Sequence, residues 1–143
     1  MKIAVLSLGT NMGDRQKNID GAIRALGLLP DTNVLSVSHC HNTKPVGLLN
    51  QPDFLNCCVK ISTELSPNAL LGACLGIEAA MGRLRGEKNG SRVIDVDIVA
   101  VENVVMNTPE LTLPHPRAQE RTFVTRPMSE LFAGDGALGI KFR

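Results

Sequence analysis

Four short runs of hydrophobic and β-branched residues in this chain have the pattern of β-strands. They cover residues 2–10, 34–42, 54–63 and 94–101. The first run is predominantly apolar, which predicts a central strand that is buried on both faces. The second alternates between hydrophobic and polar residues, which is typical of a strand with one face in the core. The runs predict the strands of one sheet.

Two further segments carry hydrophobic residues at helical spacing. The first repeats them at Ile19, Ala22, Ile23 and Leu26. Asp14 or Asn11, in the turn before it, can cap this helix. The second helix is predicted to begin at Ser66 and Pro67, because serine is favoured at the N-cap and proline at the first helical position. Gly82 is expected to end it.

The order of these elements is strand, helix, strand, strand, helix, strand. This is the split βαβ, or ferredoxin-like, arrangement of the α+β class, in which helices cover one face of a mainly antiparallel sheet. A short hairpin is expected at residues 102–107. The chain has 143 residues with no internal repeat and no linker, so a single domain over residues 1–143 is predicted.

The charge balance of the chain excludes partners that need a broad charged surface. The formal net charge is +1, which gives no electrostatic footprint for nucleic acid or for an anionic membrane. No apolar run approaches the roughly 20 residues of a membrane span, and polar residues follow the first strand at once, unlike a signal peptide. A cytoplasmic protein is expected, with neither nucleic acid nor a membrane as its partner.

The cysteines and histidines give little sign of a metal centre. No C-x-x-C spacing occurs among the cysteines, which are Cys40, Cys57, Cys58 and Cys74. Three fall in strand-like runs and one in a helix, so reduced core cysteines are expected. His39 and His41 would share a strand face, but no second ligand pair is near in sequence. A position at the surface or the edge of the core is therefore favoured for both.

Asp95 and Asp97 are the only charged residues in the apolar run 93–101. Residues i and i+2 of a strand point to the same face, so the two carboxylates should project side by side. Like charges repel, and their burial without a partner is costly. Mg²⁺ removes both problems, since it accepts one or two carboxylates and takes its other ligands from water and phosphate oxygens. A solvated polar strand face is the alternative interpretation.

Three arginines, Arg83, Arg85 and Arg92, come shortly before the aspartates. The planar guanidinium group matches the geometry of phosphate oxygens. A solvated loop is the alternative explanation for them. Taken with the aspartates, they predict a site where metal and arginines hold the phosphates of a nucleotide.

Four blocks of this sequence stand out together. They are Leu-Gly-Thr-Asn-Met-Gly-Asp-Arg at 8–15, Thr-Lys-Pro-Val-Gly at 43–47 with Gln-Pro-Asp-Phe-Leu-Asn at 51–56, Arg-Val-Ile-Asp-Val-Asp-Ile at 92–98, and Leu-Pro-His-Pro-Arg at 113–117 with Arg-Thr-Phe at 121–123. These blocks resemble those of the 6-hydroxymethyl-7,8-dihydropterin pyrophosphokinases, a family of folate biosynthesis. They occur in the family's order and cover nearly the whole chain. The set is far more specific than any one block.

The resemblance implies transfer of the β,γ-pyrophosphoryl group of ATP to the hydroxymethyl oxygen of the pterin, with AMP as the second product. It implies ATP as co-substrate, two Mg²⁺ ions on Asp95 and Asp97, and a monomer or weak dimer. The implied catalytic residues are Arg83, Arg85, Arg92, Asp95 and Asp97. The implied ATP-binding residues are Glu78, Arg85, Arg92, Ile98, His115 and Arg121. The implied pterin-binding residues are Thr43, Val46, Phe54, Asn56 and Phe123.

A flat pterin ring needs aromatic faces above and below it and polar groups at its rim. By the resemblance, Phe54 and Phe123 sandwich the ring, although a core position is the plainer interpretation of each. Asn56 lies two residues from Phe54, hence on the same strand face, and can pair with the ring edge. Glu78 is expected on a different helix face from the apolar row, where a solvated position is the alternative to an adenosine contact.

The chain departs from the family's pattern mainly in one loop. Many members carry an aromatic residue, often Trp, before the arginine of the third block, and a proline next to that arginine. Asn89 and Ser91 stand at these places, and Pro116 stands where some members have Tyr. The loop at 86–91 is therefore where this protein is expected to differ most from its relatives.

Two other functions stay open from the residues. A different two-metal nucleotidyl transferase on a ferredoxin-like core would also use paired aspartates, but it would release pyrophosphate from ATP. A non-catalytic module is the second, including a family member that binds pterin and ATP with weakened catalysis. A ferredoxin-like RNA binder would need exposed aromatic residues on its strands, and the first strand has none.

Overall fold

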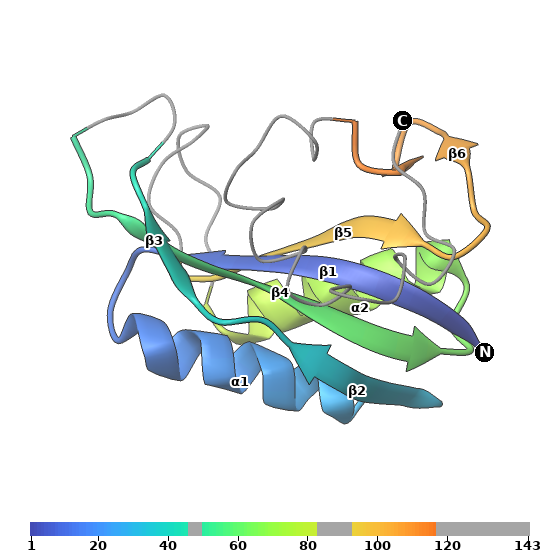
Figure 1. Cartoon of the computed structure of the whole chain (residues 1–143), viewed down its shortest axis with the longest axis horizontal. Coiled ribbons are helices and arrows are strands. Elements are labelled where there is room, and N and C mark those ends of the chain that lie inside the picture. Colours follow the sequence, from blue (N-terminus) through green and yellow to red (C-terminus); the bar gives the residue numbers. More distant parts are fainter. Residues whose placement is uncertain (46–49, 83–92, 117–143) are drawn as a thin grey trace.

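The computed structural model of the chain describes residues 1–45, 50–82 and 93–116. Its main sheet has the strand order β2-β4-β1-β5, with β3 also paired to β4, and every pairing is antiparallel (Figure 1). The strands are β1 (Lys2–Thr10), β2 (Thr32–Val37), β3 (His41–Thr43), β4 (Phe54–Thr63) and β5 (Asp95–Val101). The predicted central position of the first strand is confirmed, since β1 lies between β4 and β5.

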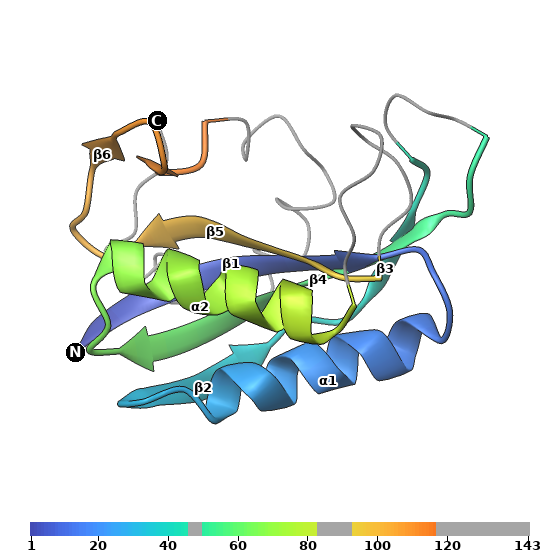
Figure 2. The ribbon, with the colours of Figure 1, turned by 180° about the vertical axis from the view of Figure 1, so that it is seen from behind.

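Helices α1 (Arg15–Gly27) and α2 (Pro67–Ala80) lie on the same face of this sheet (Figure 2). Asp14 caps α1 by accepting a hydrogen bond from the Lys17 amide, and Ser66 caps α2 by accepting one from the Ala69 amide. The Gly82 backbone has φ +90°, a conformation that glycine tolerates best, just after α2 ends. The predicted ferredoxin-like α+β arrangement is confirmed.

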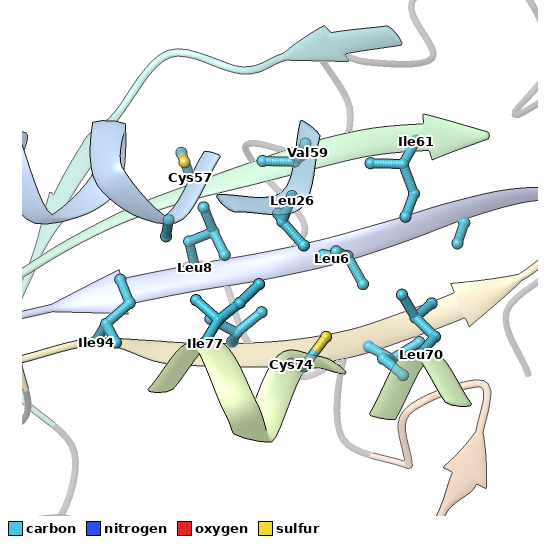
Figure 3. Packing of buried hydrophobic residues seen from close by; sticks show 14 of the residues in the cluster. Leu6, Leu8, Leu26, Cys57, Val59, Ile61, Leu70, Cys74, Ile77 and Ile94 are labelled. Carbon is cyan, nitrogen blue, oxygen red and sulfur yellow. The ribbon is translucent and has the colours of Figure 1, made fainter. Parts of the chain in front are cut away.

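The hydrophobic core fills the space between the sheet and the two helices (Figure 3). Leu6 and Leu8 reach it from β1, and Val59 reaches it from β4. The helices contribute Leu26, Leu70, Cys74 and Ile77. Successive strand residues point to opposite faces, so the residues between these core positions face away from α1 and α2. The candidate chemistry of the chain is found on that second face.

The predicted strand at 34–42 is two strands. Ser38 lies between them: its amide donates to the Cys58 carbonyl and its hydroxyl accepts from the Cys58 amide, both at 2.9 Å. Val37 is paired with Val59, and His41 with Asn56. One strand therefore advances four residues while β4 advances three, and the extra residue breaks the ladder as a bulge. The correction also moves Cys40 out of a strand, into the segment between β2 and β3.

A small second sheet follows β5. It pairs β6 (Met106–Asn107) with β7 (Thr112–Leu113). The hairpin expected within residues 102–107 is therefore displaced along the chain. Asn103, with φ +58°, turns the backbone after β5 before the hairpin starts. The amide of His115 then donates to the Val99 carbonyl at 2.7 Å, which attaches the segment after β7 to β5.

Candidate active site

One row of paired residues crosses the sheet on the face opposite the helices. Asp95 of β5 is paired with Gly9 of β1, Gly9 with Asn56 of β4, and Asn56 with His41 of β3. Residues paired directly across antiparallel strands project to the same face. The register therefore places the expected metal-binding carboxylate and the expected pterin-binding amide on one face, separated by a glycine.

Asp95 and Asp97 are both half-buried, and the residues next to them, Val96 and Ile98, are buried in the core. This alternation confirms that the two carboxylates share a face. Two hard oxygen donors at this spacing fit Mg²⁺, which needs few protein ligands. Among the described residues, no group of three or more His, Cys, Asp or Glu side chains is placed to hold a metal ion. Such a cation would complete its coordination with water and phosphate oxygens.

Glu78 lies on the buried face of α2, contrary to the expectation of a different face from the apolar row. Its side chain is 5% exposed, and its Oε2 atom accepts a hydrogen bond from the Val96 amide at 2.7 Å. The reason is the packing of α2 along β5, visible in Figure 2, which brings the last turn of the helix against the strand. A solvated position for Glu78 is therefore wrong. The carboxylate satisfies a backbone donor between the two aspartates.

Ile98 is 4% exposed and points into the core. Because the side chain is buried, Ile98 could contact ATP only through its backbone atoms in β5. His115 is half-buried beside β5, to which its amide is bonded. His115 therefore lies next to the strand that carries the two aspartates. Its role toward ATP stays a prediction.

The expected pterin-binding residues among the described ranges lie together. Thr43 is paired with Phe54 across β3 and β4. Asn56 is 4% exposed, and its Nδ2 atom donates to the Thr43 hydroxyl at 2.5 Å. This bond fixes the orientation of the amide, whose remaining atoms can read the edge of a flat ring. Phe54 is half-buried on the same face, two residues away along β4.

Six predicted site residues lie outside the described residues. They are Val46, Arg83, Arg85, Arg92, Arg121 and Phe123. Their roles toward the pterin and the phosphates stay predictions. The described ranges stop at Gly82 and resume at Val93, so they include the residues on either side of the arginine-rich segment 83–92.

Sequence reasoning missed a set of polar contacts between the start of α1 and the segment before β4. Asn11 was a candidate helix cap, but Asp14 takes that role. The Nδ2 atom of Asn11, a residue only 2% exposed, instead donates to the Gln51 side chain and to the Pro52 carbonyl, both at 2.9 Å. Nothing local distinguishes such an asparagine from a cap, because its partners lie about 40 residues away.

The cysteines are free thiols, as expected. Burial raises the pKa of the Cys74 thiol from 9.0 to about 12, and the charges of Glu78 and Asp97 add to this. Burial also raises the pKa of Cys57 far above its ordinary value, with the neighbouring thiols Cys40 and Cys58 adding to the effect. Because the thiolate is the reactive form, these two cysteines have a structural place in the core.

A ferredoxin-like sheet with two carboxylates, a fixed amide and a phenylalanine on one face has the make-up of a phosphoryl-transfer site for a small flat acceptor. Residues 5–133 match the family model of 7,8-dihydro-6-hydroxymethylpterin-pyrophosphokinase. The chain belongs to this family.

None of the described helices is long and apolar enough to cross a membrane.

Individual relatives agree with the family assignment. A Methylorubrum extorquens protein, 2-amino-4-hydroxy-6-hydroxymethyldihydropteridine pyrophosphokinase, is 43% identical over 131 residues, which are 92% of this chain and 83% of the relative. A Bacillus subtilis protein of the same name is 39% identical over 129 residues, 90% of this chain and 77% of the relative. The folic acid synthesis protein fol1 of Schizosaccharomyces pombe is 45% identical over 130 residues, 91% of this chain but 18% of the relative.

A solved structure of an HPPK-DHPS in complex with substrates has the same fold. It superposes with a TM-score of 0.66 at 15% sequence identity, over 91% of this chain and 40% of the solved chain. At this identity the likeness concerns the fold alone.

Proposed function

We propose that this chain transfers the pyrophosphoryl group of ATP to the hydroxymethyl oxygen of 6-hydroxymethyl-7,8-dihydropterin, a step of folate biosynthesis that leaves AMP. Its family supports the reaction. One structural observation carries the proposal: the row from Asp95 through Gly9 to Asn56, which joins a carboxylate pair to a fixed amide on one sheet face. We further propose that it acts as a cytoplasmic monomer or weak dimer.

The ATP side of the proposed site is built on β5. Asp95 and Asp97 would hold two Mg²⁺ ions, and both carboxylates are kept in place by a strand whose neighbouring side chains are buried. Bound Mg²⁺ would neutralise the phosphates and polarise the reacting groups. Arginines would hold the phosphate oxygens by bidentate hydrogen bonds. The proposed ATP-binding set is Glu78, Arg83, Arg85, Arg92, Ile98, His115 and Arg121.

The pterin side would be built on β3 and β4. Phe54 would stack on one face of the ring and Phe123 on the other, while Asn56 pairs with the ring edge. Thr43 and Val46 would offer backbone groups. This arrangement orients the hydroxymethyl oxygen toward the β-phosphorus. The new bond joins these two atoms, the bond from the β-phosphorus to the oxygen of AMP breaks, and the hydroxyl proton passes to solvent.

The product formed from ATP tests the proposal. The purified protein, incubated with ATP, Mg²⁺ and 6-hydroxymethyl-7,8-dihydropterin, is expected to release AMP in step with pterin pyrophosphate. Release of pyrophosphate would identify the alternative nucleotidyl transferase. Binding of both substrates without AMP would identify a family member with weakened catalysis. Absence of AMP at high enzyme concentration would sink the proposal.

Replacement of Asp97 tests the metal role directly. The Asp97→Ala variant removes one of two carboxylate ligands, so AMP formation is expected to fall at least about 100-fold, since even outer-shell changes at metal sites cost 10 to 100-fold. Higher Mg²⁺ should restore part of this loss. The matched control is Asp20→Ala, an exposed aspartate of α1 on the helical face of the sheet. Full activity in Asp97→Ala would remove Asp97 from the metal site.

A further inference from the structure

Arg15 connects the ends of the two strands that carry the proposed pterin-binding residues. Its Nη1 atom donates to Asn42 Oδ1 at 2.7 Å and to the backbone oxygen of Asp53 at 3.1 Å. Asn42 directly precedes Thr43, and Asp53 directly precedes Phe54. One guanidinium group therefore holds β3 and the start of β4 together at the point where the proposed pterin site begins.

The two strand ends are also bonded to each other. Asn42 Nδ2 donates to Asp53 Oδ2 at 3.0 Å, so Arg15, Asn42 and Asp53 form a closed ring of contacts. The strand β3 has only three residues, His41–Thr43, and a bulge separates it from β2. So short a strand has few ladder hydrogen bonds of its own. The contacts from Arg15 supply fixation that the sheet does not.

The position of Arg15 in α1 does not explain why a positively charged residue stands there. Arg15 is the first residue of α1, and the first turn contains no acidic residue. A cation at a helix N-terminus is unfavourable to the helix dipole. The guanidinium group therefore contributes through its tertiary contacts, about 27 and 38 residues away in the sequence.

We infer that Arg15 is a positioning residue of the pterin subsite. It holds Asn42 and Asp53, and through them it fixes the spacing of Thr43 and Phe54 and the amide of Asn56. Arg15 is not assigned any contact with the substrate. This inference rests on the proposed function, because it assigns a supporting group to the same site.

The first experiment compares the two Michaelis constants. Arg15→Ala is expected to raise the KM for the pterin about tenfold, since a hydrogen bond to a charged group is lost on each strand end. The KM for ATP should stay unchanged, because β5 is not touched. Arg15→Lys should recover part of the affinity, as an ammonium group can reach one acceptor but lacks the planar fork. The control is Arg24→Ala, an exposed arginine in the last turn of the same helix.

A direct binding measurement separates this inference from the proposed reaction. Calorimetry with 6-hydroxymethyl-7,8-dihydropterin should show the same loss of affinity in Arg15→Ala, with Tm close to that of the unchanged protein. If the unchanged protein bound the pterin but formed no AMP, the proposed reaction would fail while calorimetry still tested Arg15. An unchanged pterin affinity in Arg15→Ala overturns the inference. A lowered Tm with equal increases in both Michaelis constants overturns it as well, since that indicates a general structural role.

A double variant tests the contact itself. Arg15→Ala and Asn42→Ala both remove the hydrogen bond between Arg15 and Asn42, so the loss of pterin affinity in the double variant should be smaller than the product of the two single losses. Losses that multiply would mean that the two residues act independently, which contradicts the closed ring of contacts.

Discussion

Gly9 illustrates at the residue scale how a missing side chain shapes the candidate site. It lies in the row between Asp95 and Asn56, on the face that carries both. A Cβ atom at this position would lie 2.8 Å from Asn56 Oδ1 and 3.8 Å from Phe54 Cδ1. The first distance is too short for a stable contact. Asn56 has little freedom to move away, because it is buried and bonded to Thr43.

Gly9→Ala is therefore expected to weaken pterin binding about tenfold and to destabilise the fold by about 1–3 kcal/mol through overpacking. Calorimetry and denaturant unfolding measure the two effects. Gly72→Ala is the matched control, because the Cβ atom it would add on α2 meets nothing within 4 Å beyond its chain neighbours and the backbone of its own helix. That change should be neutral or stabilising, as alanine is the better helix former. Equal behaviour of the two variants would contradict the crowding at Gly9.

At the scale of elements, α2 supports the strand of the aspartates through a buried carboxylate as well as through its core side chains. Glu78 accepts the Val96 amide, and β5 lies at the edge of the main sheet in the described chain. A backbone donor on such a strand needs a partner from outside the ladder. Because Val96 lies between Asp95 and Asp97, this bond also helps to set the direction of both carboxylates.

Removal of this acceptor should reduce stability and activity together. Glu78→Ala leaves the Val96 amide unpaired and is expected to cost about 1–3 kcal/mol of unfolding free energy, with a lower rate of AMP formation. Glu78→Gln keeps an acceptor oxygen and should recover most of both. Glu64→Ala serves as the control, since the carboxylate of this exposed residue pairs with the N-terminal amine at the surface. If Gln and Ala at position 78 behave alike, the hydrogen bond to Val96 is not what matters.

Most of the elements follow from local pattern, but the predictions that failed have causes in strand pairing between distant segments. The periodic runs, the candidate caps before α1 and at Ser66, and the stop at Gly82 predicted six elements, which occur in that order among the described elements. The break at Ser38 could not be predicted, because a strand's alternation does not reveal that its partner is one residue shorter. The hairpin was displaced for a similar reason. Strands of two residues have only a weak sequence pattern, so their position depends on the strand with which they pair.

At the scale of the whole molecule, two buried thiols make the free energy of unfolding depend on pH in the alkaline range. The pKa of Cys74 is raised to about 12, and that of Cys57 is raised as well, in both cases chiefly by burial. Below pH 9 the thiols keep their protons in the folded and the unfolded chain, so they add no pH dependence. Above pH 9 the unfolded chain releases protons that the folded chain retains, and stability must fall as pH rises.

The expected slope is up to about 1.4 kcal/mol per pH unit for each thiol between pH 9 and pH 12. Unfolding by urea at several pH values, under reducing conditions, measures it. The chain has no tyrosine, so phenol groups do not obscure this window. Cys74→Ala should show a shallower decline than the unchanged chain. Identical slopes would mean that the Cys74 thiol titrates alike in both states.

The candidate site was partly visible in the sequence. Asp95 and Asp97 could be placed on one face because that relation depends only on alternation along a strand. The shared face of Phe54 and Asn56 follows in the same way. The sequence did not predict Arg15 or Gly9 as parts of the site, since each acts on residues tens of positions away. Glu78 was misplaced because a helical pattern cannot tell a buried, bonded carboxylate from a solvated one.

By itself, the sequence determined the elements, their ferredoxin-like order and the paired carboxylates, since period, capping and alternation are relations between neighbours in the chain. The tertiary structure decided which strands meet and in what register. That register places Gly9 between Asp95 and Asn56 and turns Glu78 toward Val96. It also brings Arg15 to Asn42 and Asp53. Such contacts depend on how distant segments pack, and no local pattern encodes them.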